Sequence, residues 1–205
     1  MRKYLPGITA FILAFGILSI SFMKSASIRY AFTQVSPKPT EKPTIVKIDY
    51  QVPYPGKILP DHLLWPAKAS RDKIWHLLSA NLLRRAELSV LFADKRLLMS
   101  KALFEKQKPD LGFSTLTKAE KYLEKALVEE GLARKEGQDT SRVLVKIATS
   151  ALKHREIINE ILEIAPGDAK PGIVTMEGKV IDVYKRAVEA LNSKGITAPV
   201  NPFDQ

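Results

Sequence analysis

The sequence predicts an all-α protein, in which an N-terminal transmembrane helix precedes a bundle of about five amphipathic helices. Two observations carry this prediction: an uncharged run at residues 5–23, and apolar residues that recur at spacings of three and four along most of the later chain. The chain accordingly divides into a membrane anchor or signal peptide at 1–32, a proline-rich linker at 33–60, the helical bundle at 61–195 and a flexible tail at 196–205.

Residues 5–23 are long enough to cross a bilayer as a helix. At about 1.5 Å per residue they span the roughly 30 Å hydrocarbon core, and a helix satisfies nearly all of its backbone polar groups internally. A cleavable signal peptide is the alternative, with residues 25–27 (Ser-Ala-Ser) as the candidate cleavage site. Because Lys24 interrupts the approach to that site and the uncharged run is long for a signal peptide, we favour an uncleaved anchor that places the chain in the membrane.

Charge does not decide which side of the membrane the bundle occupies. Arg2 and Lys3 precede the uncharged run and Lys24 and Arg29 follow it, so the positive-inside rule gives a tie. The net charge of the chain is +10, but the later basic residues alternate with acids along the predicted helices, as on solvated faces. No basic stripe with interleaved aromatic residues occurs, so nucleic acid is not an expected partner.

The chain contains no cysteine and 13 prolines, which limits the kinds of cross-link and metal site it can have and indicates where it is extended. Without cysteine the chain has no disulfide, no lipid-modified cysteine and no thiolate metal site. The prolines around residues 36–43 favour an extended, polyproline-like linker that holds the bundle off the membrane. Residues 45–50 alternate like a strand, but no partner strand is evident. We expect this segment to be extended, either lying on the bundle or free.

Five helices are expected after the linker, with ends set by proline, glycine and capping residues. Short connections between them favour antiparallel neighbours, and the second carries apolar residues on more than one side, which places it at the centre. The expected helices run from about Pro66 to Leu78, from Asn81 or Leu82 to Lys106, from Ser114 or Thr117 to before Gly137, from Asp139 or Thr140 to Ala165, and from just after Asp168 to before Gly195.

Several segments resemble a family of uncharacterised bacterial helical proteins, the domain of unknown function 5667. The segments read YPGKILPD at 54–61, LLWPAK at 63–68, RAELSVLFADKRL at 85–97, KAEKYLEKAL at 118–127 and HREIINEIL at 154–162. The resemblance implies an exported or membrane-tethered helical domain without catalytic residues. It therefore favours a bundle that lies outside the cytoplasmic membrane.

The sequence departs from that family in its first motif. Trp65 and Ala67 stand where tyrosine and leucine are more usual. We expect Trp65, and Trp75 in the helix that follows, to anchor the core rather than to form a ligand platform.

Candidate metal ligands are the three histidines and their neighbouring carboxylates. Asp61 and His62 are adjacent in a loop, which is a poor arrangement for binding one ion. Asp72 and His76 lie four residues apart on one helix face, so they could begin a two-ligand site. His154 lies in an apolar stripe and is expected to donate a hydrogen bond to a neighbouring helix. On balance we predict no metal ligand, no cofactor and no cofactor-binding residue.

Paired carboxylates offer no clear acid–base site. Glu129 and Glu130, and likewise Glu156 and Glu160, fall on helices that we expect to be solvated, and such pairs catalyse only where a pocket separates their pKa values. Phosphate-binding loops and nucleophile elbows do not occur in the sequence. We therefore predict no catalytic residue and no enzyme activity.

The expected function follows from the anchor and the bundle together. We predict a single-pass protein of the cytoplasmic membrane, whose extracytoplasmic bundle presents a helical face to a partner protein or to a second copy of the chain. The alternative is an envelope sensor whose helical domain binds a metal or a small apolar molecule.

Overall fold

The computed structural model describes residues 30–33 and 47–204 of the chain. Within these residues the structure is all-helical and contains no strand, which confirms the prediction of an all-α bundle with five α-helices. The helices are α2 (Trp65–Leu78), α3 (Leu82–Glu105), α4 (Pro109–Lys135), α5 (Ser141–Ile164) and α6 (Lys170–Asn192), followed by the short 3-10 helix η1 (Pro202–Asp204).

The predicted membrane-spanning segment at residues 5–23 lies outside the described residues. Among the helices that are described, none has the length and apolar composition needed to cross a bilayer. The anchor therefore stays a prediction from the sequence.

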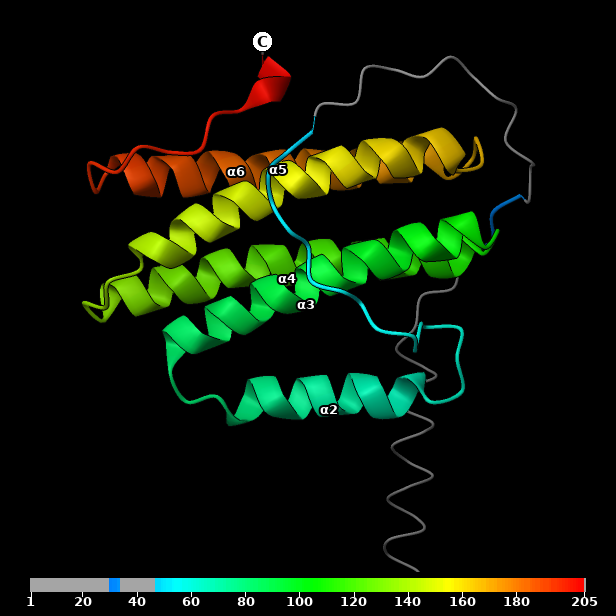
Figure 1. Cartoon of the computed structure of the whole chain (residues 1–205), viewed down its shortest axis with the longest axis horizontal. Coiled ribbons are helices and arrows are strands. Elements are labelled where there is room, and N and C mark those ends of the chain that lie inside the picture. Colours follow the sequence, from blue (N-terminus) through cyan, green and yellow to red (C-terminus); the bar gives the residue numbers. More distant parts are fainter. Residues whose placement is uncertain (1–29, 34–46, 205) are drawn as a thin grey trace, which may run out of the picture.

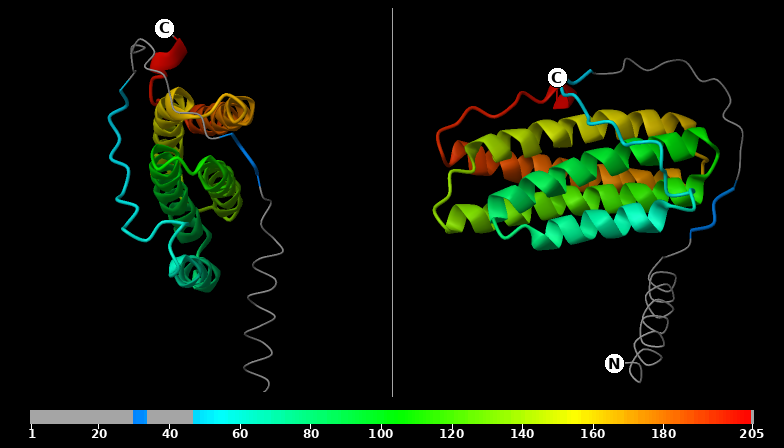
Figure 2. Two further views of the ribbon diagram at one scale, coloured as in Figure 1. Left: turned by 90° about the vertical axis from the view of Figure 1, so that its right-hand side faces the viewer. Right: turned by 60° about the horizontal axis from the view of Figure 1, so that its bottom comes forward.

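Helices α3 to α6 form a four-helix bundle, and α2 lies outside it (Figure 1). Helix α3 packs against α4 and α5, and α6 packs against α5 and α4, so the four helices occupy the corners of a square when viewed end-on (Figure 2, left). Short turns join α3 to α4 and α5 to α6, which makes each pair an antiparallel hairpin. The backbone of helix α2 closely approaches only that of α3.

The core lies between the four long helices and is built from the apolar stripes of the sequence. Leu97 on α3, Leu123 on α4, Ile158 on α5 and Val180 on α6 are all buried there. Each such side chain contributes about 1.5–3 kcal/mol of stability when it is fully removed from water. The alternation of spacings by three and four aligned these residues on one side of each helix, so the periodicity was sufficient to predict the core.

Three helices end in the same type of turn, with a residue of positive φ just after the last helical turn. These residues are Gln107 (φ 55°), Gly137 (φ 80°) and Gly195 (φ 68°). In each turn the next residue donates its N–H to a carbonyl of the preceding helix: Lys108 to Leu103 at 2.9 Å, Gln138 to Ala133 at 3.1 Å, and Ile196 to Leu191 at 3.0 Å. The hydrogen bonds satisfy carbonyl groups that the helix end would otherwise leave free.

Helix α4 begins at Pro109, five or more residues earlier than we expected from Ser114 or Thr117. The sequence-based start was wrong because Pro109 was taken only as the end of the preceding helix. Proline is favourable in a first turn, where its missing N–H has no helical partner, and Asp110 adds a negative charge near the helix N-terminus. The remaining helices begin within about two residues of the expected positions.

The described part of the predicted linker, residues 47–60, lies on the bundle (Figure 1). Ile48 and Leu59 are buried, and the Ile48 N–H donates a hydrogen bond of 2.7 Å to Glu156 Oε2 on α5. Of the two expectations for the strand-like run, the one that places it on the bundle is confirmed for these residues. A free linker is therefore wrong for this part of the chain.

The described C-terminal residues contact the bundle, and the flexibility expected of residues 196–205 stays a prediction from the sequence. The Tyr184 hydroxyl donates a hydrogen bond of 2.6 Å to the Pro199 carbonyl oxygen, which fastens the segment along α6. The Arg155 guanidinium on α5 lies 4.5 Å from the centre of the Phe203 ring in η1. These polar and cation–π contacts hold a segment whose composition alone indicates a loose end.

Candidate functional site

A buried ionic cluster joins three helices of the bundle. His154 on α5 lies between Glu120 on α4 and Asp94 on α3, with Nδ1 3.0 Å from Glu120 Oε1 and Nε2 3.2 Å from Asp94 Oδ1. All three side chains are no more than 2% exposed. The prediction that His154 bonds to a neighbouring helix is confirmed, and it reaches two helices. We call Asp94, Glu120 and His154 the His154 cluster.

The two carboxylates keep the imidazole of His154 protonated. Burial opposes the charged form, but the negative charge of Glu120 and the hydrogen bonds to both carboxylates outweigh burial and raise the pKa of His154 to about 9. At neutral pH both ring nitrogens therefore carry protons and donate, one to each carboxylate. The cluster as a whole holds two negative charges and one positive charge in the interior.

Two hydroxyl groups supply further donors to Asp94. Ser150 Oγ donates to Oδ1 and the Tyr50 hydroxyl donates to Oδ2, each over 2.6 Å. Burial and the neighbouring Asp94 charge raise the pKa of Tyr50, which keeps its proton available for this bond. Because both oxygens of Asp94 are engaged and the cluster is closed to water, its geometry suits the fastening of helices rather than proton transfer.

A second buried carboxylate, Glu129 on α4, fastens α2 to the bundle. Its Oε1 atom lies 3.0 Å from His76 Nε2 on α2 and 3.1 Å from Arg85 Nη2 on α3. Ser89 Oγ on α3 donates to Oε2 over 2.6 Å. His76 Nε2 also lies within hydrogen-bond distance of Oε2, at 3.3 Å, whereas Oε1 has ion-pair contacts but no hydrogen bond. Glu129 therefore contacts polar groups of two other helices, and loss of His76 or Ser89 would leave its buried charge still less satisfied.

The carboxylates that we expected on solvated faces are mostly buried, so that expectation was wrong. Glu129, Glu130 and Glu156 are each no more than 5% exposed. Glu130 accepts hydrogen bonds from Thr140 Oγ1 at 2.6 Å and Arg134 Nε at 3.1 Å, and thereby holds the turn between α4 and α5. Each acid accepts at least one hydrogen bond from another element, as from Thr140 to Glu130 and from the Ile48 N–H to Glu156, which a pattern of spacings within one helix does not show.

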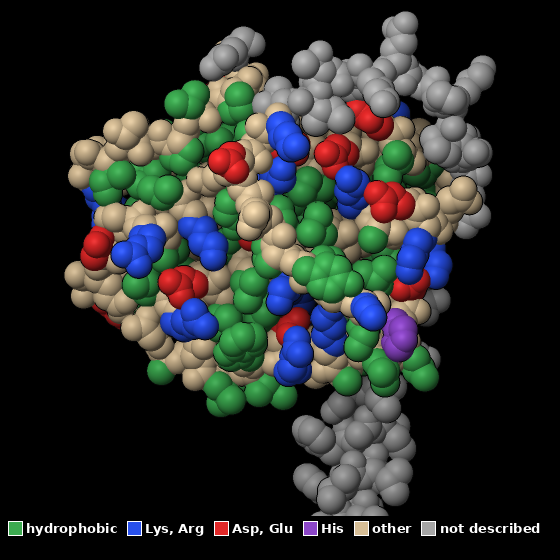
Figure 3. All heavy atoms as spheres, viewed as in Figure 1, with side chains coloured by type: hydrophobic (Ala, Val, Ile, Leu, Met, Phe, Trp, Pro, Cys, Tyr) green, Lys and Arg blue, Asp and Glu red, His purple; other side chains and the backbone are tan. Residues whose placement is uncertain are grey.

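Helix α2 is inverted relative to an ordinary surface helix. Its buried residues are Asp72 and His76, whereas its large apolar side chains face away from the bundle. Leu63 is 90% exposed and Leu77 is 82% exposed. We define the α2 apolar face by the exposed residues Leu63, Leu64, Ile74, Trp75, Leu77 and Leu78. Figure 3 shows hydrophobic side chains gathered along the lower edge of the molecule, where α2 lies in Figure 1.

Trp75 belongs to this exposed face, so the expectation that it anchors the core was wrong. Residue Trp75 is 44% exposed, and its ring packs edge-to-face against Phe92 on α3 with ring centres 6.2 Å apart. Trp65 is half-buried, with Lys68 Nζ 5.6 Å from its ring centre.

The bundle surface under α2 explains the inversion, because that surface is itself polar. Arg96 on α3 is buried there, with its guanidinium 4.4 Å from the Tyr122 ring centre, and burial lowers its pKa. Glu129 and Arg85 lie on the same side of the bundle and bind His76 or each other. A helix that covers such a surface gains most by turning its own polar residues inward.

The candidate metal ligands do not converge. Asp72 accepts a hydrogen bond of 2.8 Å from Arg71, while His76 on the same helix turns to Glu129. Asp61 binds Lys108 Nζ at 2.7 Å. Within the part of the chain that the structure describes, no three His, Asp or Glu side chains are grouped so that they could hold a metal ion.

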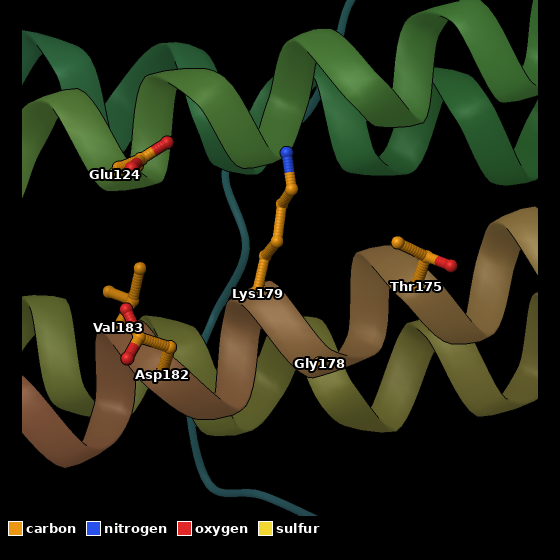
Figure 4. Close-up of a pocket in the computed structure, with 6 residues that line it drawn as sticks. All are labelled: Glu124, Thr175, Gly178, Lys179, Asp182 and Val183. Atoms are coloured by element: carbon orange, nitrogen blue, oxygen red, sulfur yellow. The ribbon is translucent and has the colours of Figure 1, made fainter.

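A shallow groove of about 280 Å³ lies between α4 and α6. Figure 4 shows Lys179 extending from α6 toward α4, with the other polar side chains pointing along the groove or away from it. Its lining residues are Glu124, Thr175, Gly178, Lys179, Asp182 and Val183. Every polar side chain among them is exposed to water, so the groove offers no desolvated group to a ligand. The α2 apolar face is therefore the stronger candidate site.

Comparisons with known protein families, with curated proteins and with solved structures found no match. The resemblance to the domain of unknown function 5667 thus stays a prediction from the sequence segments that carry it.

Proposed function

We propose that this protein is a membrane-anchored, extracytoplasmic helical interaction module that acts by binding and performs no catalysis. The observation that carries the proposal is the α2 apolar face, whose six large side chains are exposed on helix α2 and in the turn that precedes it. Large apolar side chains exposed together along one edge of a folded protein mark contact sites. Burial of these side chains against another surface would be favourable, by about 25 cal/mol for each Å² removed from water.

The orientation of α2 is held by specific polar contacts, which supports a role for its outward face. His76 binds Glu129 on the inner side of the helix. Lys68 Nζ donates to the carbonyl oxygens of Pro55 and Ile58 over 2.7 and 2.9 Å, which ties the start of the helix to the segment before it. These contacts would be lost if α2 rotated to bury its apolar side.

The anchor and the side of the membrane rest on the sequence. Residues 5–23 have the length and composition of a membrane span, and the resemblance to an exported or tethered family favours a bundle outside the cytoplasm. The alternative, an envelope sensor, has less support, because the described residues contain no grouped metal ligands and the α4–α6 groove is lined by exposed polar groups.

Protease accessibility in spheroplasts tests the anchor and the orientation together. The full chain carries a C-terminal tag, and its apparent mass is read from an undigested sample. We expect digestion of the tag in intact spheroplasts and a full-length mass in the control, because the bundle lies outside an uncleaved anchor. A cytoplasmic protein that survives the same digestion controls for lysis.

Two results would contradict the proposal. Protection of the tag until the spheroplasts are lysed would place the bundle in the cytoplasm. A mass lower by roughly the first 27 residues would mean that the anchor is a signal peptide that is removed.

A further inference from the structure

The first described residues, Tyr30–Thr33, are fixed at the end of the bundle where α2 begins. The Phe32 N–H donates a hydrogen bond of 2.7 Å to Asp110 Oδ1 in the first turn of α4. Lys108, two residues before Asp110, binds Asp61 at 2.7 Å, and Asp61 lies just ahead of α2. Figure 2 shows residues 30–33 at this same end of the bundle. The Thr33 N–H also donates a hydrogen bond of 2.7 Å to Asp168 Oδ2, just before α6. The point where the chain leaves toward its N-terminus therefore lies between the starts of α4 and α6, at the same end of the bundle as the start of α2.

The connection between this point and the predicted anchor is short. Residues 24–29 separate Tyr30 from the uncharged run at 5–23. Even when fully extended, a segment of this length reaches only about 20 Å, at roughly 3.3–3.6 Å per residue. If residues 5–23 cross the bilayer, Tyr30 must remain within that distance of its surface, so the end of the bundle at which α2 begins is the end held toward the membrane. Such a tether gives α2 a high effective concentration at the membrane.

The charges beside the α2 apolar face are cationic. At 100° per residue from Ile74, Lys73 falls beyond Leu77 at one edge of the face. Arg71 falls between Leu78 and Trp75 near the other edge. Arg71 and Lys73 are both exposed. The neighbouring acids, Asp61 and Asp72, are engaged with Lys108 and Arg71. A tryptophan-, leucine- and isoleucine-bearing face with basic borders is typical of helices that lie in the interface of an anionic membrane.

A second copy of the chain suits this face less well. In an α2–α2 pairing Arg71 and Lys73 of both copies would lie at one interface. Asp72, the one acid of α2, is buried and already paired with Arg71, so Lys73 would have no acid of α2 to pair with. Like charges brought together in this way oppose association. Anionic lipid headgroups would instead neutralise them.

From these observations we infer that the α2 apolar face rests on the anionic surface of the bilayer that holds the anchor. Helix α2 then lies in the membrane interface and sets the orientation of the four-helix bundle, in addition to the tether at residues 24–29. This inference rests on the proposed function, because it requires the anchor to be inserted in the membrane.

Fluorescence of a probe at position 77 tests the inference in the full-length chain. The sequence has no cysteine, so Leu77→Cys provides a single labelling site for an environment-sensitive fluorophore. The matched control is Val174→Cys. Val174 is 53% exposed and belongs to α6, which lies on the other side of the bundle from α2 (Figure 1). Both labelled chains are reconstituted into vesicles of phosphatidylglycerol with phosphatidylcholine and into vesicles of phosphatidylcholine alone. A spin-labelled lipid serves as the quencher.

We expect quenching at position 77 that exceeds quenching at position 174 by about twofold or more, and that is stronger in the phosphatidylglycerol vesicles. Addition of Ile74→Glu to the labelled chain should reduce quenching at 77, because it places a negative charge at the centre of the face. Ile74 is exposed, so an unchanged circular dichroism spectrum is expected and checks that the fold is retained.

Flotation of the vesicles after a carbonate wash separates failure of the inference from failure of the proposed function. If the chain floats but position 77 is quenched no more than position 174, the anchor stands and α2 does not rest on the membrane. Disulfide formation between two unlabelled Leu77→Cys chains, without lipid quenching, would assign the face to a second copy and overturn the inference. A chain that does not float has no inserted anchor, and both proposals fail. Equal quenching in the two kinds of vesicle would contradict the inference that Arg71 and Lys73 attract α2 to anionic lipid headgroups.

Discussion

Replacement of His154 by alanine is expected to lower the free energy of unfolding by about 3–5 kcal/mol. The imidazole is the cation between two carboxylates that are no more than 2% exposed, Asp94 and Glu120. Without it, both charges remain in the interior and repel each other, and Glu120 loses the donor that lies 3.0 Å away. The cavity left by the ring adds to the loss.

Chemical denaturation of the chain from Tyr30 onward measures this effect. His62→Ala is the matched control, because His62 is exposed in the loop before α2, and its replacement should change the free energy of unfolding by no more than about 0.5 kcal/mol. A loss below about 1 kcal/mol for His154→Ala would mean that the imidazole does not bridge the two carboxylates.

The stability of the protein is expected to fall as the pH rises from about 6.5 to about 9. The pKa of His154 is raised from 6.5 to about 9 in the folded chain. A raised pKa means that the folded state binds the proton more tightly than the unfolded state does. The resulting stabilisation is complete below pH 6.5, declines as the pH rises toward the folded pKa and is lost above it. Its full size is roughly 3 kcal/mol, because each tenfold difference in proton affinity corresponds to about 1.4 kcal/mol.

The free energy of unfolding, measured at intervals between pH 6 and 10, checks this expectation. The His154→Ala chain serves as the reference, because the difference between the two curves removes the contributions of other groups that titrate in the same range. That difference should shrink steadily across the window. Parallel curves would show that His154 is neutral in the folded protein.

The helical core was predictable because it depends on spacing alone. Leu123 on α4 and Ile158 on α5 fall on stripes that the sequence displays directly, and both are fully buried. The start of α4 was harder to predict from the sequence, because a proline such as Pro109 can either end one helix or begin the next. In the structure Pro109 begins α4, because the first turn of α4 packs against the end of α3. Gly112 permits this packing, since the Phe104 ring lies 2.8 Å from the position that a Cβ atom would occupy.

The buried acids were not predictable from composition, although one signal was present. Glu120 lies four residues after Leu116 and three before Leu123, so it occupies the same stripe as two core residues. An acid in such a position must be matched by a donor from another helix. His154 also lies in an apolar stripe, so an ion pair between Glu120 and His154 could have been proposed from the sequence. The contact of His154 with Asp94 could not, because it depends on how α3, α4 and α5 are arranged.

The orientation of α2 could not be read from its own sequence. The helix has one apolar and one polar side, and periodicity identifies both without saying which side faces the bundle. The answer depends on the surface beneath it, where Arg96 and Glu129 are buried. His76 is buried whereas Leu77, the next residue, is exposed, so the polar side of α2 faces the bundle.

The most direct test of an inverted α2 compares Leu77→Gln with His76→Ala by chemical denaturation of the chain from Tyr30 onward. We expect Leu77→Gln to change the free energy of unfolding by no more than about 0.5 kcal/mol, because the leucine is exposed. His76→Ala should cost about 1–3 kcal/mol, because it removes a donor 3.0 Å from the buried Glu129. If Leu77→Gln proved the more destabilising of the two, the apolar side of α2 would face the bundle, and the interaction surface proposed for this protein would not exist.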